Sequence, residues 1–189
     1  MNEDRVGTIA RTLRNAIIEQ AIKPGTHLPE DTIGDRFGAS RTIVRAALEE
    51  IVVSRLAGAL QPDQIAALEA HVAEEEKVRN VDEPHSIRLA GEFHVLLAEF
   101  TGSQVLTQYM RELTSRCCLM LAMYSRPHSS ECGVTEHQEL VGLLKKGDQA
   151  TAVKAMRSHL QGVIDRALIQ PPKREDRPLD EILNSYASD

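Results

Sequence analysis

The sequence is poor in aromatic residues and cysteines and has no long apolar run, and each lack narrows the class of protein. Aromatic residues make up 3% of 189 positions, Trp is absent, and Ala, Leu, Ile, Val, Glu and Arg dominate, which is typical of an all-α protein. Three cysteines, two of them adjacent, are no disulfide framework and indicate free thiols in a reducing cytoplasm. No secretory signal or membrane-spanning run occurs, so the sequence predicts a cytoplasmic protein with no membrane partner.

Excess positive charge and the common catalytic motifs are missing as well. The net charge of −6 argues against indiscriminate coating of nucleic acid. Acidic side chains slightly outnumber basic ones even within residues 1–51, so a DNA-binding segment would have to gather its basic groups on one face. There is no Gly-rich phosphate loop, HExxH pair or nucleophile–base signature. We therefore expect a protein that is not an enzyme.

The most informative part of the sequence is the stretch LPEDTIGDRFGASRTIVRAALEEI, which predicts two short helices joined by a turn. Gly38 supplies the turn, where a positive φ is often needed. Ser40 suits the N-cap of the second helix, and Arg41 and Arg45 project from one face at i,i+4 spacing. This pattern predicts a helix-turn-helix unit within residues 1–56 whose second helix enters a DNA major groove. The expected DNA contacts are Arg41, Arg45, Ser40, Thr42 and Arg36.

The remainder of the chain predicts a helical bundle over residues 57–170, because apolar residues recur there at helical spacing. The acidic run at 74–76 is expected to be solvated. The charged, proline-bearing residues 171–189 predict a flexible tail. The expected helix starts are Pro62, Asp82, Ser103, Thr135 and Asp148.

Three histidines of this bundle form a candidate metal site. His137 and His159 lie roughly 15 and 18 Å along their helices from a hairpin turn at Gly147, so antiparallel packing brings them to a similar level. His94 lies in an apolar run and is expected to point inward. Three inward imidazoles at similar depth suit a Zn²⁺, Ni²⁺ or Mn²⁺ ion, while the alternative for each is a hydrogen-bonded core residue. No role is assigned to His27, His71, His85 and His128.

Four motifs, IKPGTHL, SRTIVRAAL, EFH and EH, the last followed by GD and MRSHL, occur in an order that resembles the GntR family of bacterial transcription regulators. The resemblance is to the FadR-type branch with an FCD effector domain and covers about residues 5–168. It implies a winged helix-turn-helix that binds a palindromic double-stranded DNA operator as a homodimer. It also implies a bundle that senses a small molecule, often a carboxylate, through a metal. The implied metal ligands are His94, His137 and His159, and Arg111 or Arg88 is expected to contact the effector.

Two departures from the family pattern change these expectations. The family's metal-binding Asp position holds Ala90, which cannot coordinate, so that a water or an anion must complete the site or the affinity falls. No alternating, Gly-centred hairpin follows the second helix, so the wing and part of the effector domain are expected to be missing. Loss of a bundle helix is expected to open one side of the metal pocket.

Two other functions remain open at this point. A three-His site with an open position could serve a metal-dependent hydrolase or lyase. A shortened regulator could also be a degenerate subunit that dimerises but binds DNA weakly.

Overall fold

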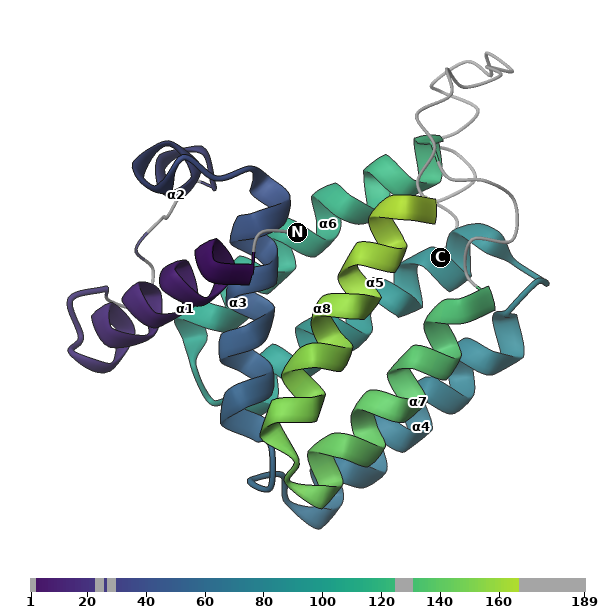
Figure 1. The fold of residues 1–189 in the computed structure, drawn as a ribbon. Coiled ribbons are helices and arrows are strands. Elements are labelled where there is room, and N and C mark those ends of the chain that lie inside the picture. Colours follow the sequence, from purple (N-terminus) through teal and green to yellow (C-terminus); the bar gives the residue numbers. More distant parts are fainter. Residues whose placement is uncertain (1–2, 23–25, 27–29, 125–130, 167–189) are drawn as a thin grey trace.

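The computed structural model describes residues 3–22, 26, 30–124 and 131–166, and every regular element in these ranges is an α-helix (Figure 1). This confirms the all-α class. The end of the expected bundle at residue 170 and the expected tail at 171–189 lie outside the described residues. The helices are α1 (Glu3–Ile18), α2 (Glu30–Phe37), α3 (Arg41–Leu56), α4 (Pro62–Val78), α5 (Glu83–Phe100), α6 (Gln104–Tyr124), α7 (Glu131–Lys146) and α8 (Gln149–Arg166).

The first three helices form the predicted helix-turn-helix. Gly38 has a φ of +58°, as expected for the turn, and its carbonyl accepts a hydrogen bond from Arg5 Nη1 of α1 at 2.6 Å. Ser40 occupies the N-cap of α3 with an extended backbone, but its side chain makes no capping hydrogen bond. The helix start was therefore predicted correctly, whereas the hydroxyl cap was not.

The third helix is covered on both sides. It packs against α1 and α2 on one side and against α5, α6 and α8 on the other (Figure 1). None of its described side chains from Ile43 to Ala57 is exposed. A half-buried ion pair between Glu50 and Arg157 ties it to α8. The helix expected to insert into DNA is thus also a core helix of the bundle.

The short link after α3 leaves no room for a wing. Residues 57–61 are all that separates α3 from α4, which is too few for a β-hairpin. This link packs on the α7–α8 turn, where the Gly58 amide donates to the Leu144 carbonyl at 2.9 Å. A Cβ on Gly58 would lie 3.3 Å from Gly147 Cα, so two glycines allow the turns to meet. On the side of the bundle, α3 packs against α5, α6 and α8.

The other helix starts agree with expectation except at α7. Asp82 caps α5 by accepting from the His85 amide at 3.0 Å, and Asp148 accepts from the Thr151 amide at 3.1 Å at the start of α8. Because α7 begins at Glu131, Thr135 lies inside the helix and does not cap it.

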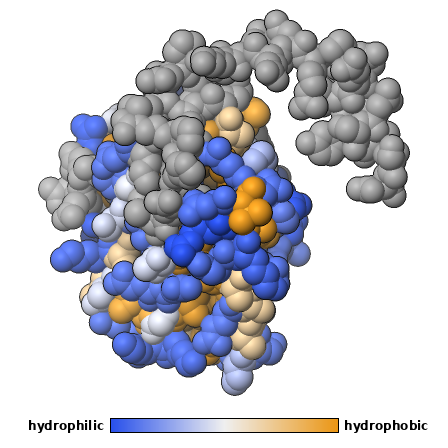
Figure 2. All heavy atoms as spheres, turned by 90° about the vertical axis from the view of Figure 1, so that its right-hand side faces the viewer, coloured by the Kyte–Doolittle hydropathy of each residue, from blue (hydrophilic) through white to orange (hydrophobic). Residues whose placement is uncertain are grey.

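The surface over α4 and α7 is mostly hydrophilic, with small hydrophobic areas between the polar ones (Figure 2). In the part of the chain that the structure describes, no helix has the length and apolar character needed to cross a bilayer.

Candidate metal centre and sensor pocket

Three buried histidines from three helices meet in the bundle. His94 of α5, His137 of α7 and His159 of α8 expose at most 4% of their surface. His159 Nε2 lies 3.2 Å from His94 Nε2 and 3.4 Å from His137 Nε2. One possible ligand atom from each ring lies within 4.8 Å of the others. The structure therefore brings together the trio that the sequence predicted.

A glutamate carboxylate lies next to the Nδ1 atom of each imidazole. Glu75 of α4 lies 2.8 and 3.1 Å from His137 Nδ1, and Glu136 lies 2.6 Å from His159 Nδ1. The Glu49–His94 pair differs: Glu49 Oε1 is 2.8 Å from His94 Nδ1, but neither atom has a hydrogen-bond partner in a favourable direction.

The donor set fits a divalent metal ion. A carboxylate facing Nδ1 favours the tautomer in which Nδ1–H donates to it, which leaves Nε2 as an acceptor with its lone pair toward the centre. Neighbouring acceptors at 3.2 and 3.4 Å repel each other unless a cation or proton lies between them. Two donors at about 2.0–2.1 Å from a tetrahedral ion lie about 3.3–3.4 Å apart. These two distances match the spacing of ligands around a zinc ion, and imidazole also suits nickel.

Burial keeps two of the rings ready to bind a metal. It lowers the pKa of His159 to about 3 and that of His94 well below the ordinary histidine value, because a charged ring loses its hydration inside the protein. Burial opposes ionisation of Glu75, but hydrogen bonds from His137 and His71 outweigh it and lower its pKa. Burial raises the pKa of Glu49 to about 7.

Aromatic packing fixes the His137 ring from its other side. Phe93 stacks on His137 with centroids 4.0 Å apart and an interplanar angle of 14°. Phe93 is fully buried and follows Glu92 in the EFH motif. The neighbouring residues of this motif thus belong to one site: His94 is a candidate ligand, and Phe93 packs on another candidate ligand.

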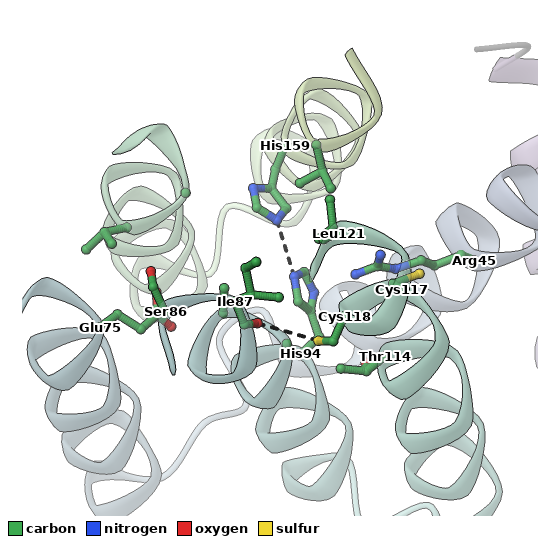
Figure 3. Close-up of a pocket in the computed structure, with 15 residues that line it drawn as sticks. Arg45, Glu75, Ser86, Ile87, His94, Thr114, Cys117, Cys118, Leu121 and His159 are labelled. Carbon is green, nitrogen blue, oxygen red and sulfur yellow. Dashed lines mark hydrogen bonds between the residues drawn. The ribbon is translucent and has the colours of Figure 1, made fainter. Parts of the chain in front are cut away.

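A small cavity of ≈ 70 Å³ lies beside the histidines (Figure 3). Arg45 reaches into it from α3, toward His94 (Figure 3), and its Nε lies 3.5 Å from Glu49 Oε1. Arg45 Nε and Thr114 Oγ1 are buried polar atoms without a hydrogen-bond partner. Ala90, where the family resemblance implied Asp, also lines this cavity and leaves space next to the metal centre. Most of the exposed lining of the cavity is apolar.

Arg45 is therefore not placed for the DNA contact that was expected of it. Its side chain is 12% exposed, because α5 and α6 cover the face of α3 from which it projects. Ser40 and Arg36 are exposed, and their DNA contacts stay predictions. The side chains of Arg41 and Thr42 lie outside the described residues, and their DNA contacts stay predictions.

The arginines expected to bind an effector lie elsewhere. Arg88 and Arg111 are 64% and 63% exposed and line an open outer groove, separate from the cavity beside the histidines. Arg111 donates to Glu99 at 2.5 Å. Among the residues that the structure describes, Arg45 is the arginine that lines the cavity beside the histidines.

Sequence reasoning missed the carboxylates and one histidine of this site. The acidic run was expected to be solvated, yet Glu75 is 1% exposed. His71, which had no assigned role, bonds to the Leu89 carbonyl at 2.9 Å and lies 3.4 Å from Glu75. Their i,i+4 spacing, like that of Arg45 and Glu49, was the available signal.

A helix-turn-helix joined to a helical bundle with an enclosed polar site defines a DNA-binding regulator. The model of the bacterial regulatory proteins of the gntR family matches residues 5–62, and that of the FCD domain matches residues 42–162. The chain therefore belongs to the GntR family of transcription regulators and carries an FCD domain. Both matches include residues 42–62, and thus most of α3. This agrees with the packing of α3 against the helix-turn-helix on one side and the bundle on the other.

Solved structures support the fold. The chain is similar to a GntR protein of Streptococcus agalactiae, with a TM-score of 0.55 and 17% identity over 86% of this chain and 100% of that one. It is also similar to Lar, which controls the expression of the Listeria monocytogenes agr system, with a TM-score of 0.51 and 16% identity over 85% of this chain and 95% of that one. Comparison with curated proteins gave no significant match.

Proposed function

We propose that this regulator senses a small carboxylate through a metal ion held by His94, His137 and His159. The observation that carries the proposal is the convergence of three Nε2 atoms, each on a ring whose Nδ1 faces a glutamate. A bound divalent ion would supply positive charge and open coordination positions for oxygen ligands. Zinc, nickel and manganese are the candidates.

Two groups in the cavity support a carboxylate as the effector. Arg45 supplies a buried cation, and Thr114 supplies a hydroxyl that needs a partner. A carboxylate can bind a guanidinium with two hydrogen bonds. A volume of ≈ 70 Å³ suits a ligand of a few heavy atoms, since a liquid water occupies about 30 Å³.

The response would reach DNA through α3. Arg45 and Glu49 of this helix face the site, and its N-terminal tip carries Ser40 beside the helix-turn-helix turn. A ligand that moves α3 would shift this tip relative to α1 and α2. We further propose that a homodimer presents two such tips to a palindromic operator in the cytoplasm.

A second candidate function is that of a subunit with weakened DNA binding. The burial of α3 from Ile43 onward favours it, because most of α3 itself is then unable to enter a major groove. By contrast, a hydrolase or lyase would need a base next to a metal-bound water. Glu49, Glu75 and Glu136 each face a ring Nδ1, away from the metal side, and none is placed for that task.

Two measurements test the proposal. Untagged protein is analysed for metal and titrated with Zn²⁺ and Co²⁺, where we expect one ion per chain and loss of this uptake in His137→Ala. An absence of binding in the wild type refutes the metal site. A mobility shift on the chain's own upstream DNA, with and without metal and acetate, tests regulation, and its salt dependence estimates the number of phosphate contacts. A shallow slope favours the weakened subunit.

A further inference from the structure

His71 lies one helical turn before Glu75 on α4, just outside the metal centre. Its Nε2 lies 2.9 Å from the Leu89 carbonyl of α5 and 3.4 Å from Glu75 Oε1. Its side chain is 15% exposed and borders the outer groove. A single ring nitrogen thus joins α4 to α5 at the carboxylate that supports His137.

The partners of His71 settle which ring nitrogen carries its proton. A carbonyl and a carboxylate are both acceptors, so Nε2 must donate. Glu75 then has the Nε2–H of His71 at 3.4 Å from its Oε1, besides two contacts with His137 Nδ1. The bond with Glu75 also raises the pKa of His71. Because Glu75 is buried, removing one donor leaves part of its charge unsatisfied.

His71 acts on the site from a distance. Its Nε2 is already engaged by two acceptors, and the ligand cluster within 4.8 Å contains only His94, His137 and His159 among the described residues. His71 also lies beside Phe93, with ring centroids 6.3 Å apart, and Phe93 stacks on His137. His71 thus contacts two residues, Glu75 and Phe93, that both touch the His137 ring.

We propose that His71 is a positioning residue of the metal centre: its Nε2–H holds the Glu75 carboxylate in the orientation that fixes the His137 ring. This inference rests on the proposed metal site. It adds to that site a fourth histidine, which supports a ligand but does not itself bind the metal. Groups next to a metal ligand commonly change affinity by about 10–100-fold. One step further out, we expect His71 to contribute about 3–10-fold.

The test compares His71→Leu, which removes the donor, with His71→Gln, whose amide nitrogen can replace Nε2–H. Each full-length protein is titrated with Co²⁺ against a chelator, and the visible spectrum of the saturated protein is recorded. We expect His71→Leu to bind Co²⁺ about 3–10-fold more weakly with altered bands, and His71→Gln to retain both properties. His85→Leu, at the start of α5, controls for the loss of a surface imidazole.

Each possible outcome of these titrations either supports or overturns the role of His71. Equal affinity and spectrum in His71→Leu and wild type overturn the role of His71 and leave the metal site intact. Equal weakening in His71→Gln and His71→Leu shows that packing, rather than the donor, is responsible and also overturns it. A wild type that takes up no Co²⁺ refutes the metal site itself and the inference with it. If His71→Leu does not fold, His71→Asn, whose amide is too short to reach Glu75, takes its place.

Discussion

Glu75 Oε2 lies 2.8 Å from His137 Nδ1, although 62 residues separate the two in the chain. The contact joins α4 to α7 and gives a buried carboxylate a defined partner. It also sets the orientation of a candidate metal ligand, since a ring that donates from Nδ1 must offer Nε2 to a metal. Stability and metal affinity should therefore depend on this acidic residue far more than on its neighbours.

The substitution Glu75→Gln should weaken metal binding by about 10–100-fold, because a neutral amide makes the imidazole a poorer ligand than a carboxylate does. Zn²⁺ competition titration measures the change. Glu74→Gln is the matched control, since Glu74 is 57% exposed and pairs only with Lys77 in the described part of the chain. Equal affinities in the two variants would contradict the assigned role of Glu75.

The substitution Arg45→Met should affect effector binding more than DNA binding. It removes the cavity guanidinium while keeping an unbranched apolar stem, and the loss of a charged hydrogen bond should weaken acetate binding to the metal-loaded protein by about 10–100-fold. Calorimetric titration with acetate and with the larger citrate checks both the loss and the size limit of the cavity.

Arg36→Ala, on the exposed surface of α2, should show the opposite pattern, with normal acetate binding and a weaker mobility shift. If Arg45→Met abolishes the shift of the ligand-free protein while its folding is intact, Arg45 contacts DNA and its placement in the cavity is not the DNA-binding state.

Acid should destabilise the metal-free protein through His159. Burial holds its folded pKa at about 3 against an ordinary 6.5, so between these values the unfolded chain binds a proton that the folded chain does not. The stabilising effect of this neutral ring is present above pH 6.5 and is lost as the pH falls, by about 1.4 kcal/mol per pH unit.

Urea unfolding of wild type and His159→Gln, with a chelator present, measures this effect. As the pH falls, the free energy of unfolding should decrease more steeply for the wild type than for the variant. The difference in slope should be about 1.4 kcal/mol per pH unit. His85→Gln should follow the wild type. Parallel curves for wild type and His159→Gln would show that the ring is accessible to protons in the folded state.

Close packing of α5 on α6 should make Gly91 intolerant of a side chain. A Cβ there would lie 2.5 Å from Cys118 Sγ and 2.6 Å from Thr114 Cγ2. Overpacking typically costs about 1–3 kcal/mol, while replacing a helical glycine by alanine gains about 1 kcal/mol. We expect Gly91→Ala to destabilise the protein by about 1 kcal/mol net.

Gly142→Ala is the control for that experiment, because a Cβ at this helical position meets nothing within 4 Å. It should raise the thermal unfolding midpoint, whereas Gly91→Ala should lower it. A gain in stability at Gly91 would mean that α6 can move away from α5 more readily than the structure indicates.

Local signals explain what could be predicted from the sequence. Asp82 and Asp148 cap their helices through amides three residues away, and Gly147 ends α7 with a φ of +74°. Because these effects act within one helical turn, they can be recognised without knowledge of the fold. The histidine trio was also predictable, since His137 and His159 lie at matching distances from a turn and His94 lies in an apolar run.

The neighbours of these helices could not be predicted in the same way. The amino-acid pattern of α3 determined that it is a helix that follows a turn and carries an arginine pair, but only packing against α5, α6 and α8 turned Arg45 inward. Likewise, a run of glutamates at a helix end is usually hydrated, and only the contact of α4 with α7 buries Glu75. Secondary structure follows from interactions within a few residues, whereas burial depends on which distant helix covers each face.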